Sequence, residues 1–378
     1  MSIRQYNLGS IVKPGFNPLG AQTVTTTYFP YLYSWGQNNN GQLGLGNTTS
    51  YSSPKQVGAL TTWLNISAGY FHTVSVKTDG TLWTWGKNNL GQLGLGNTTY
   101  YSSPKQVGAL TSWLAVAAGY AHTVATKTDG TLWAWGRNME GQLGLGNTTG
   151  YSSPKQVGSL TTWLTIAAGT YHTLSVKTDG TLWSWGSGNN GVLGLGNTTY
   201  YSSPKQVGAL TTWSKISSRS LFSMAAKTDG TLWTWGDNAQ GKLGLGNLTN
   251  YSSPKQVGSL TNWLNVANGR TNAISVKTDG TLWTWGNGGN GQSGLGNTTS
   301  YSSPKQVGSL TTWSTIAGGA YHVIAIKTDG TLWTWGYADQ GQLGLGDITN
   351  RSSPVQVGAL TTWLKTAGGK YFTVATLY

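Results

Sequence analysis

The sequence contains no cysteine. No disulfide can therefore support the fold, and cysteine usage leaves the redox compartment open. No apolar run is long enough to cross a bilayer, and residues 1–30 lack the apolar core of a signal peptide. We therefore expect a soluble protein that is made in the cytoplasm and does not insert into a membrane.

Acidic side chains are scarce, with 10 Asp and Glu in 378 residues. Most stand in a repeated Thr-Asp-Gly turn, and the others are scattered: Glu140, Asp237, Asp339 and Asp347. Paired carboxylates for acid–base catalysis are therefore not indicated. The histidines share one position of a repeat: His72, His122, His172 and His322. A structural hydrogen bond for each is favoured over a zinc site, which would need several to converge. We expect no enzymatic activity, cofactor or metal.

What the chain does contain is a repeat of 50 residues. The segment Gly69–Gly86 (GYFHTVSVKTDGTLWTWG) returns at Gly119–Gly136 and Gly169–Gly186, and with more drift at three further places. A fixed period of this size indicates one supersecondary unit that is stacked or arranged in a ring.

Each period predicts four short strands. The segments 72–77 and 81–85 are rich in β-formers and flank the turn Thr78-Asp79-Gly80, which predicts a hairpin. Segments 54–57 and 63–68 add two more extended stretches, and no segment has the apolar period of a helix. Four strands per repeat form one blade of a β-propeller.

The two ends of the chain decide the number of blades. The Trp-Gly corner occurs seven times, from Trp35 to Trp335. The last repeat stops after the strand 370–377, and the strand that it lacks, 31–35, stands at the other end of the chain. We therefore predict an all-β, seven-bladed propeller of residues 28–378, closed by pairing of its N-terminal and C-terminal strands.

The string W-x-W-G-x-N-x-x-G-Q-L-G-L-G-N, followed by P-x-x-V and A-G-x-x-H-T, resembles the repeat of the regulator of chromosome condensation family. The resemblance covers about Tyr31 to Tyr378 and implies a seven-bladed propeller. It also implies a relation to an exchange factor for a small GTPase that docks on nucleosomes with a wedge and a basic tail, and to protein-interaction scaffolds. This chain has neither insertion nor basic tail, so we do not expect exchange activity.

Tryptophan and lysine recur with the repeat. The 20 Trp fall at the positions typified by Trp63, Trp83 and Trp85, which predicts packing between blades rather than an exposed sugar platform. The net charge is +13, and one circle of lysines is a candidate basic ring: Lys55, Lys105, Lys155, Lys205, Lys255 and Lys305. We interpret this ring as a solubilising rim, with an anionic partner such as an acidic host-surface glycan as the alternative. Nucleic acid is not expected, because Arg-rich clusters are lacking.

Specificity is expected where the copies differ, because loops on a rigid scaffold carry binding. Neutral drift in loops explains the same variation equally well. The phase of residues 70–72 varies most in the fourth and fifth copies, and the candidate interaction residues are Arg219, Phe222, Arg270, Asn272 and Lys370. The two arginines are candidate anion contacts.

Residues 1–27 stand outside the repeat and are predicted to form an anchoring arm through apolar side chains: Tyr6, Leu8, Ile11, Val12 and Phe16. The near-identical repeats, the low charge and this arm suggest a non-enzymatic virion protein of a phage tail or capsid. Such a protein would bind other virion proteins through the arm, lie on the virion surface and present its loops to the host. The alternatives are an intracellular, cytoplasmic protein-interaction scaffold related to the exchange factors, and a free carbohydrate-binding propeller.

Overall fold

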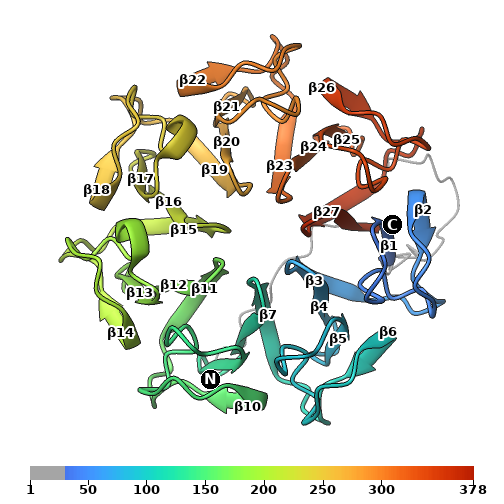
Figure 1. The fold of residues 1–378 in the computed structure, drawn as a ribbon, viewed down its shortest axis with the longest axis vertical. Coiled ribbons are helices and arrows are strands. Elements are labelled where there is room, and N and C mark those ends of the chain that lie inside the picture. The colour runs from blue at the N-terminus through green and yellow to red at the C-terminus, as the bar shows by residue number, and fades with distance from the viewer. Residues whose placement is uncertain (1–29) are drawn as a thin grey trace, which may run out of the picture.

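The computed structural model describes residues 30–378, which form seven four-stranded sheets arranged around one axis (Figure 1). Every neighbouring pair of strands within a sheet is antiparallel. Two short 3-10 turns, η1 (Asn189–Gly191) and η2 (Ala239–Gly241), interrupt the loops. No helix in this part of the chain is long and apolar enough to cross a membrane. The predicted seven-bladed propeller is confirmed.

Each blade begins at the axis with a strand that contacts the equivalent strands of the neighbouring blades (Figure 1). These innermost strands are β3 (Trp63–Ala68), β7 (Trp113–Ala118), β11 (Trp163–Ala168), β15 (Trp213–Ser218), β19 (Trp263–Asn268), β23 (Trp313–Gly318) and β27 (Trp363–Gly368). The second strands are fully buried: β4 (His72–Lys77), β8 (His122–Lys127), β12 (His172–Lys177), β16 (Phe222–Lys227), β20 (Asn272–Lys277), β24 (His322–Lys327) and β28 (Phe372–Leu377).

The Thr-Asp-Gly turn joins the second strand to the third. Gly80 has a φ of 76°, a left-handed conformation that glycine adopts without strain. Asp79 fixes the turn because its Oδ1 accepts a 2.9 Å hydrogen bond from the N–H of Thr81. The third strands are β1 (Tyr31–Gly36), β5 (Leu82–Gly86), β9 (Leu132–Gly136), β13 (Leu182–Gly186), β17 (Leu232–Gly236), β21 (Leu282–Gly286) and β25 (Leu332–Gly336).

The outermost strands differ from the prediction in where they begin. They are β2 (Tyr51–Gln56), β6 (Tyr101–Gln106), β10 (Tyr151–Gln156), β14 (Tyr201–Gln206), β18 (Tyr251–Gln256), β22 (Tyr301–Gln306) and β26 (Arg351–Gln356). The first begins three residues before Pro54, because Tyr51 pairs with Gly36 across a shift of register. Pro54 is tolerated because this strand is the free edge of its sheet, where a missing N–H breaks no ladder.

Strands from the two ends of the described chain share one blade, whose order is β2-β1-β28-β27. Tyr31 pairs with Leu377, and Gly36 pairs with Phe372. The predicted closure is therefore confirmed. The predicted boundary between the arm (1–27) and the propeller lies outside the described residues and stays a prediction.

The hydrophobic core lies between the blades. One cluster joins Trp63 and Trp85 of one blade to Leu32 and Val374 of the blade before it. The ring of Trp63 packs edge-on against that of Trp85, with ring centroids 5.8 Å apart. This confirms the packing role predicted for the repeated tryptophans.

Candidate functional site

Two kinds of loop meet on one face of the ring. The connection from the first strand to the second, typified by residues 69–71, contacts the connection that follows the third strand. The N–H of Lys87 donates to the carbonyl of Phe71 at 2.9 Å, and that of Gln37 donates to the carbonyl of Tyr371 at 2.8 Å. We call the face formed by these two connections the loop face.

Aromatic side chains gather on the loop face in what we call the aromatic arc: Tyr70, Phe71, Tyr120, Tyr171, Tyr321, Tyr337 and Tyr371. The ring centroids of Tyr70 and Tyr120 are 4.9 Å apart, and those of Tyr120 and Tyr171 are 5.7 Å apart. Tyr321 stacks on Tyr371 at 5.5 Å with an interplanar angle of 16°. All except Tyr70 keep part of their surface exposed. The arc therefore offers both apolar area and hydroxyl groups to a partner.

Four cations lie over these rings. Lys370 joins the two halves of the arc, because its Nζ is 5.2 Å from the centroid of Phe71 and 4.8 Å from that of Tyr371. The guanidinium of Arg137 lies 4.4 Å from the ring of Tyr171. The two further cations are Lys87 over Phe71 and Arg270 over Tyr321. Such cation–π contacts fix the cations in place on the surface.

The electrostatics of the arc are mixed rather than uniformly basic. Burial, with the charges of Arg270 and Lys87, lowers the pKa of Lys370. Glu140 pairs with Arg137, with 2.7 Å between Oε1 and Nη2. A hydrogen bond to Asp339 raises the pKa of Tyr337 to about 12, so this phenol stays protonated. The arc can therefore bind polar and charged protein side chains of either sign.

The structure separates the five predicted interaction residues. Arg270 and Lys370 lie on the loop face, and their role in an interaction stays a prediction. Arg219 occupies the repeat position just before that of Arg270 and Lys370, but its guanidinium Nε and Nη2 are buried. Phe222 and Asn272 are both 0% exposed, so their prediction as interaction residues is wrong. They begin second strands, which are buried along their whole length on both faces.

Sequence reasoning did not identify the arc. Its members occupy the positions equivalent to residues 37, 70 and 71, and the aromatic residues at these positions were visible in the repeat: Phe71, Tyr171, Tyr321 and Tyr371. The missed signal is that position 37 meets positions 70 and 71 in space although it lies far from them in the sequence. That contact depends on the hydrogen bond from residue 37 to residue 371 and on its equivalents.

The candidate basic ring lies on the outermost strands, so it surrounds the perimeter of the propeller instead of covering a face (Figure 1). All six lysines are exposed. Each Nζ stands over a tyrosine of its own strand, as Lys55 does at 5.4 Å from the Tyr51 ring. The ring is open at Val355, the seventh equivalent position. This arrangement fits the interpretation as a solubilising rim.

The histidines make hydrogen bonds from blade to blade. The Nε2 of His72 lies 3.1 Å from the Oγ1 of Thr123, and His322 makes the same contact with Thr373 at 2.9 Å. Burial lowers the pKa of His72 to about 3, so the ring is neutral at physiological pH. The structural role predicted for the histidines is confirmed. Within residues 30–378 no three His, Asp or Glu side chains come together as metal ligands would.

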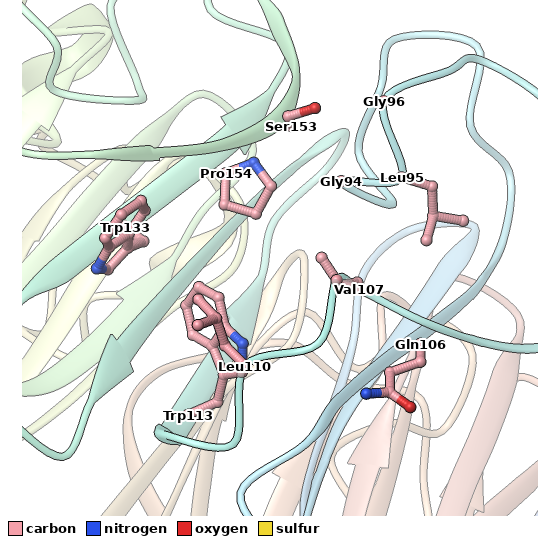
Figure 2. A pocket seen from close by; sticks show the side chains of 11 residues that line it. Gly94, Leu95, Gly96, Gln106, Val107, Leu110, Trp113, Trp133, Ser153 and Pro154 are labelled. Carbon is pink, nitrogen blue, oxygen red and sulfur yellow. The ribbon is translucent and has the colours of Figure 1, made fainter.

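Grooves also open between neighbouring blades. One has a volume of about 420 Å³ and is lined by Leu95 and Val107 on one side and by Trp113, Trp133 and Pro154 on the other (Figure 2). A second groove has a volume of about 360 Å³ and is lined by the equivalent residues two repeats later. The lining is the same in both, so these grooves are a feature of blade packing and carry no difference between the copies.

The predicted anchoring side chains, Tyr6, Leu8, Ile11, Val12 and Phe16, lie outside the described residues. Their contact with virion proteins therefore stays a prediction. Neither the contacts of residues 30–378 nor the comparisons below support a place on a virion surface or the binding of a host glycan.

Comparison with known proteins agrees with the architecture. Residues 31–375 match the RCC1-like domain family. Among solved structures, human WBSCR16 is 21% identical with a TM-score of 0.82, over 92% of this chain and 98% of that one. Prp20p from Saccharomyces cerevisiae, described with its binding to Gsp1p and histones, is 20% identical with a TM-score of 0.81, over 93% and 92%. Yeast RCC1 (Prp20) with Kap60 matches equally well, with a TM-score of 0.81. The chain belongs to the RCC1-like domain family.

Proposed function

We propose that this chain is an intracellular, non-enzymatic protein-interaction scaffold and that its loop face is the docking surface. The aromatic arc is the observation that carries the proposal. Tyrosine and arginine dominate the binding energy of protein interfaces, because they bury large areas at a small cost in side-chain entropy. Here Tyr171 and Tyr371 are held on a closed ring of sheets, so little order has to be gained when a partner binds.

The mixed charge of the arc favours a protein over a nucleic acid. A surface that binds a phosphate backbone carries an excess of Lys and Arg along one face. On this face Glu140 neutralises Arg137, and Asp339 adds a further negative charge beside Tyr337. The largest set of unpaired lysines, typified by Lys55, lies on the perimeter away from the arc.

Membership of the RCC1-like domain family supports a scaffold function over a place on a virion. Prp20p is described as binding Gsp1p and histones, and this supports a protein as the partner of the present chain. We do not extend the proposal to nucleotide exchange. The repeat keeps its spacing of 50 residues, so residues 31–378 contain no inserted segment that could form a wedge.

Affinity capture with matched variants tests the proposal. The full-length chain, the double variant Tyr171→Ala/Tyr371→Ala and the perimeter control Lys105→Ala/Lys155→Ala are immobilised, and proteins retained from native lysate are identified by mass spectrometry. We expect the same partner on the full-length chain and the control, and at least about tenfold less on the arc variant, which corresponds to about 1.4 kcal/mol. Equal recovery by all three chains would contradict the proposal.

A further inference from the structure

One position at the axis of the propeller breaks the repeat. In six blades the residue that follows the innermost strand is a glycine: Gly69, Gly119, Gly169, Gly269, Gly319 and Gly369. In the fourth blade it is Arg219. The glycine has a packing reason, because a Cβ on Gly69 would come within 2.3 Å of the ring of His72. The fourth blade has therefore placed a cation where the scaffold otherwise has no side chain.

Arg219 directly follows β15, one of the innermost strands that surround the axis (Figure 1). The N–H of Tyr70 donates to the carbonyl of Gly119, and that of Thr170 donates to the carbonyl of Ser220, in both cases at 3.3 Å. The hydroxyl of Thr170 donates to the backbone carbonyl of Arg219 at 3.1 Å. The backbone of Arg219 is thus held in the central ring of loops. Its side chain takes no part in these hydrogen bonds.

The guanidinium is near a group from another blade of the ring. Burial lowers the pKa of His322, and the charge of Arg219 adds to this lowering. His322 belongs to the blade that contains β24. Because this blade lies two places further round the ring, the coupling of His322 to Arg219 fits a guanidinium that lies toward the axis.

This cation has no partner among residues 30–378. Its Nε and Nη2 are buried and donate to no oxygen atom, while the residue as a whole is half-buried. The ion pairs of this part of the chain join Arg137 to Glu140, Lys242 to Asp237 and Arg351 to Asp347. Burial lowers the pKa of Arg219 to about 10, which still leaves it charged at neutral pH. A buried, charged group with two free donors is unfavourable unless an anion completes it.

We propose that Arg219 forms an axial anion site that binds a carboxylate from an acidic segment of the partner protein. The Nε and Nη2 donors of a guanidinium lie parallel and match the two oxygens of a carboxylate. One negative charge balances the one positive charge, whereas a phosphate dianion would leave a charge uncompensated. Arg270 and Lys370 are engaged by the rings of Tyr321 and Tyr371. The source of the carboxylate rests on the proposed protein-binding function.

The test uses the full chain and thermal unfolding, because a ligand that binds the folded state raises Tm. The probe is N-acetyl-hexaglutamate amide, and N-acetyl-hexaglutamine amide and sodium acetate at the same carboxylate concentration serve as controls, all at constant ionic strength. The key variant is Arg219→Gly, which restores the residue of the other six blades. Lys155→Gln, on the perimeter, controls for the loss of one positive charge.

We expect hexaglutamate to raise Tm of the unaltered chain and of Lys155→Gln by about 3 °C at saturation, and to leave Arg219→Gly unchanged. Hexaglutamine should have no effect on any chain. An equal shift in Arg219→Gly would overturn the axial site, and so would no shift in the unaltered chain. An equal shift with acetate would overturn the assignment to an acidic segment and leave a site for small anions.

These results remain separable from those for the proposed function. If the arc variant keeps its partner while hexaglutamate still requires Arg219, the proposed docking surface is wrong and the axial site stands. If the arc variant loses its partner while hexaglutamate ignores Arg219, the docking surface stands and the axial site is wrong.

Discussion

The indole Nε1 of Trp85 donates a 3.0 Å hydrogen bond to the carbonyl of Gln42, which belongs to the blade before it. Gly44 allows this contact, because a Cβ there would lie 2.7 Å from the same nitrogen. We expect Trp85→Phe to lower the free energy of unfolding by about 1 kcal/mol through the lost hydrogen bond, because the hydroxyl of Thr73 still donates to the same carbonyl at 2.8 Å. Trp85→Ala should lower it by about 3–5 kcal/mol through the cavity.

Denaturant unfolding followed by tryptophan fluorescence and circular dichroism measures both changes. The half-exposed Trp83, two residues earlier, is the matched control: Trp83→Phe should cost less than Trp85→Phe. The reverse order would mean that the boundary between blades is not where the stability resides.

Ring closure predicts that deletions at the two ends of the chain have unequal effects on thermal stability. Deletion of residues 370–378 removes β28, which pairs with β1 on one side and β27 on the other. We expect this deletion to abolish a single cooperative melting transition, because two strands lose their partner and a sheet edge opens. Deletion of residues 1–27 is the counterpart and should leave the transition in place. Calorimetry distinguishes these outcomes, and unchanged melting after the C-terminal deletion would refute closure by the shared blade.

The buried histidines predict acid sensitivity. The pKa of His72, His122, His172 and His322 is lowered to about 3 in the folded protein, with burial as the leading cause. In the unfolded chain each histidine has a pKa of about 6.5, so below that pH the unfolded chain binds more protons than the folded protein. Above about pH 6.5 the buried histidines do not lower the free energy of unfolding. As the pH falls from about 6.5 toward about 3, protonation of the unfolded chain lowers it progressively. At one unit below the unfolded pKa, each histidine should cost about 1.4 kcal/mol.

Replacement of histidine by phenylalanine tests this origin, because Phe222 and Phe372 already occupy the same position in two blades. The variant His72→Phe/His172→Phe should show a shallower fall of Tm between about pH 7 and pH 5 than the unaltered chain. An unaltered slope would assign the acid sensitivity to other groups.

A second set of lysines is structural. Lys127 is 8% exposed, and its Nζ lies 3.7 Å from the ring of Trp133 and 4.9 Å from that of Trp113. We expect Lys127→Gln to lower the free energy of unfolding by about 1 kcal/mol, because it removes both cation–π contacts and part of the packed stem. Lys105→Gln, an exposed perimeter change, should be close to neutral in the same denaturant titration. Equal effects would contradict the structural role of Lys127.

The fold could be predicted in detail because recurring sequence motifs mark the boundaries of each repeat. The Thr-Asp-Gly turn and the Trp-Gly corner fix each hairpin, and the incomplete last copy fixes the closure of β1 on β28. The start of β2 was missed because Tyr51 joins the sheet across a register shift, which has no mark in the sequence.

The site was less predictable because variation between copies mixes surface and core. Positions 71 and 72 vary together, yet Phe71 is partly exposed and His72 is buried. Position 71 lies in the connection before the second strand, whereas position 72 begins that strand, which is buried along its whole length and so places Phe222 and Asn272 in the core. The aromatic arc depends on contacts between blades, so no single copy of the repeat reveals it. Arg219 is the exception, because its replacement of a glycine is visible by aligning the copies.

Hydrogen exchange on the full chain, free and bound to the captured partner, tests the loop face most directly. We expect protection to increase at the connections that contain Tyr70, Tyr171 and Tyr371, with little change in the Thr-Asp-Gly turns on the opposite ends of the strands. Protection confined to those turns or to the perimeter strands would contradict the account and place the partner on another surface.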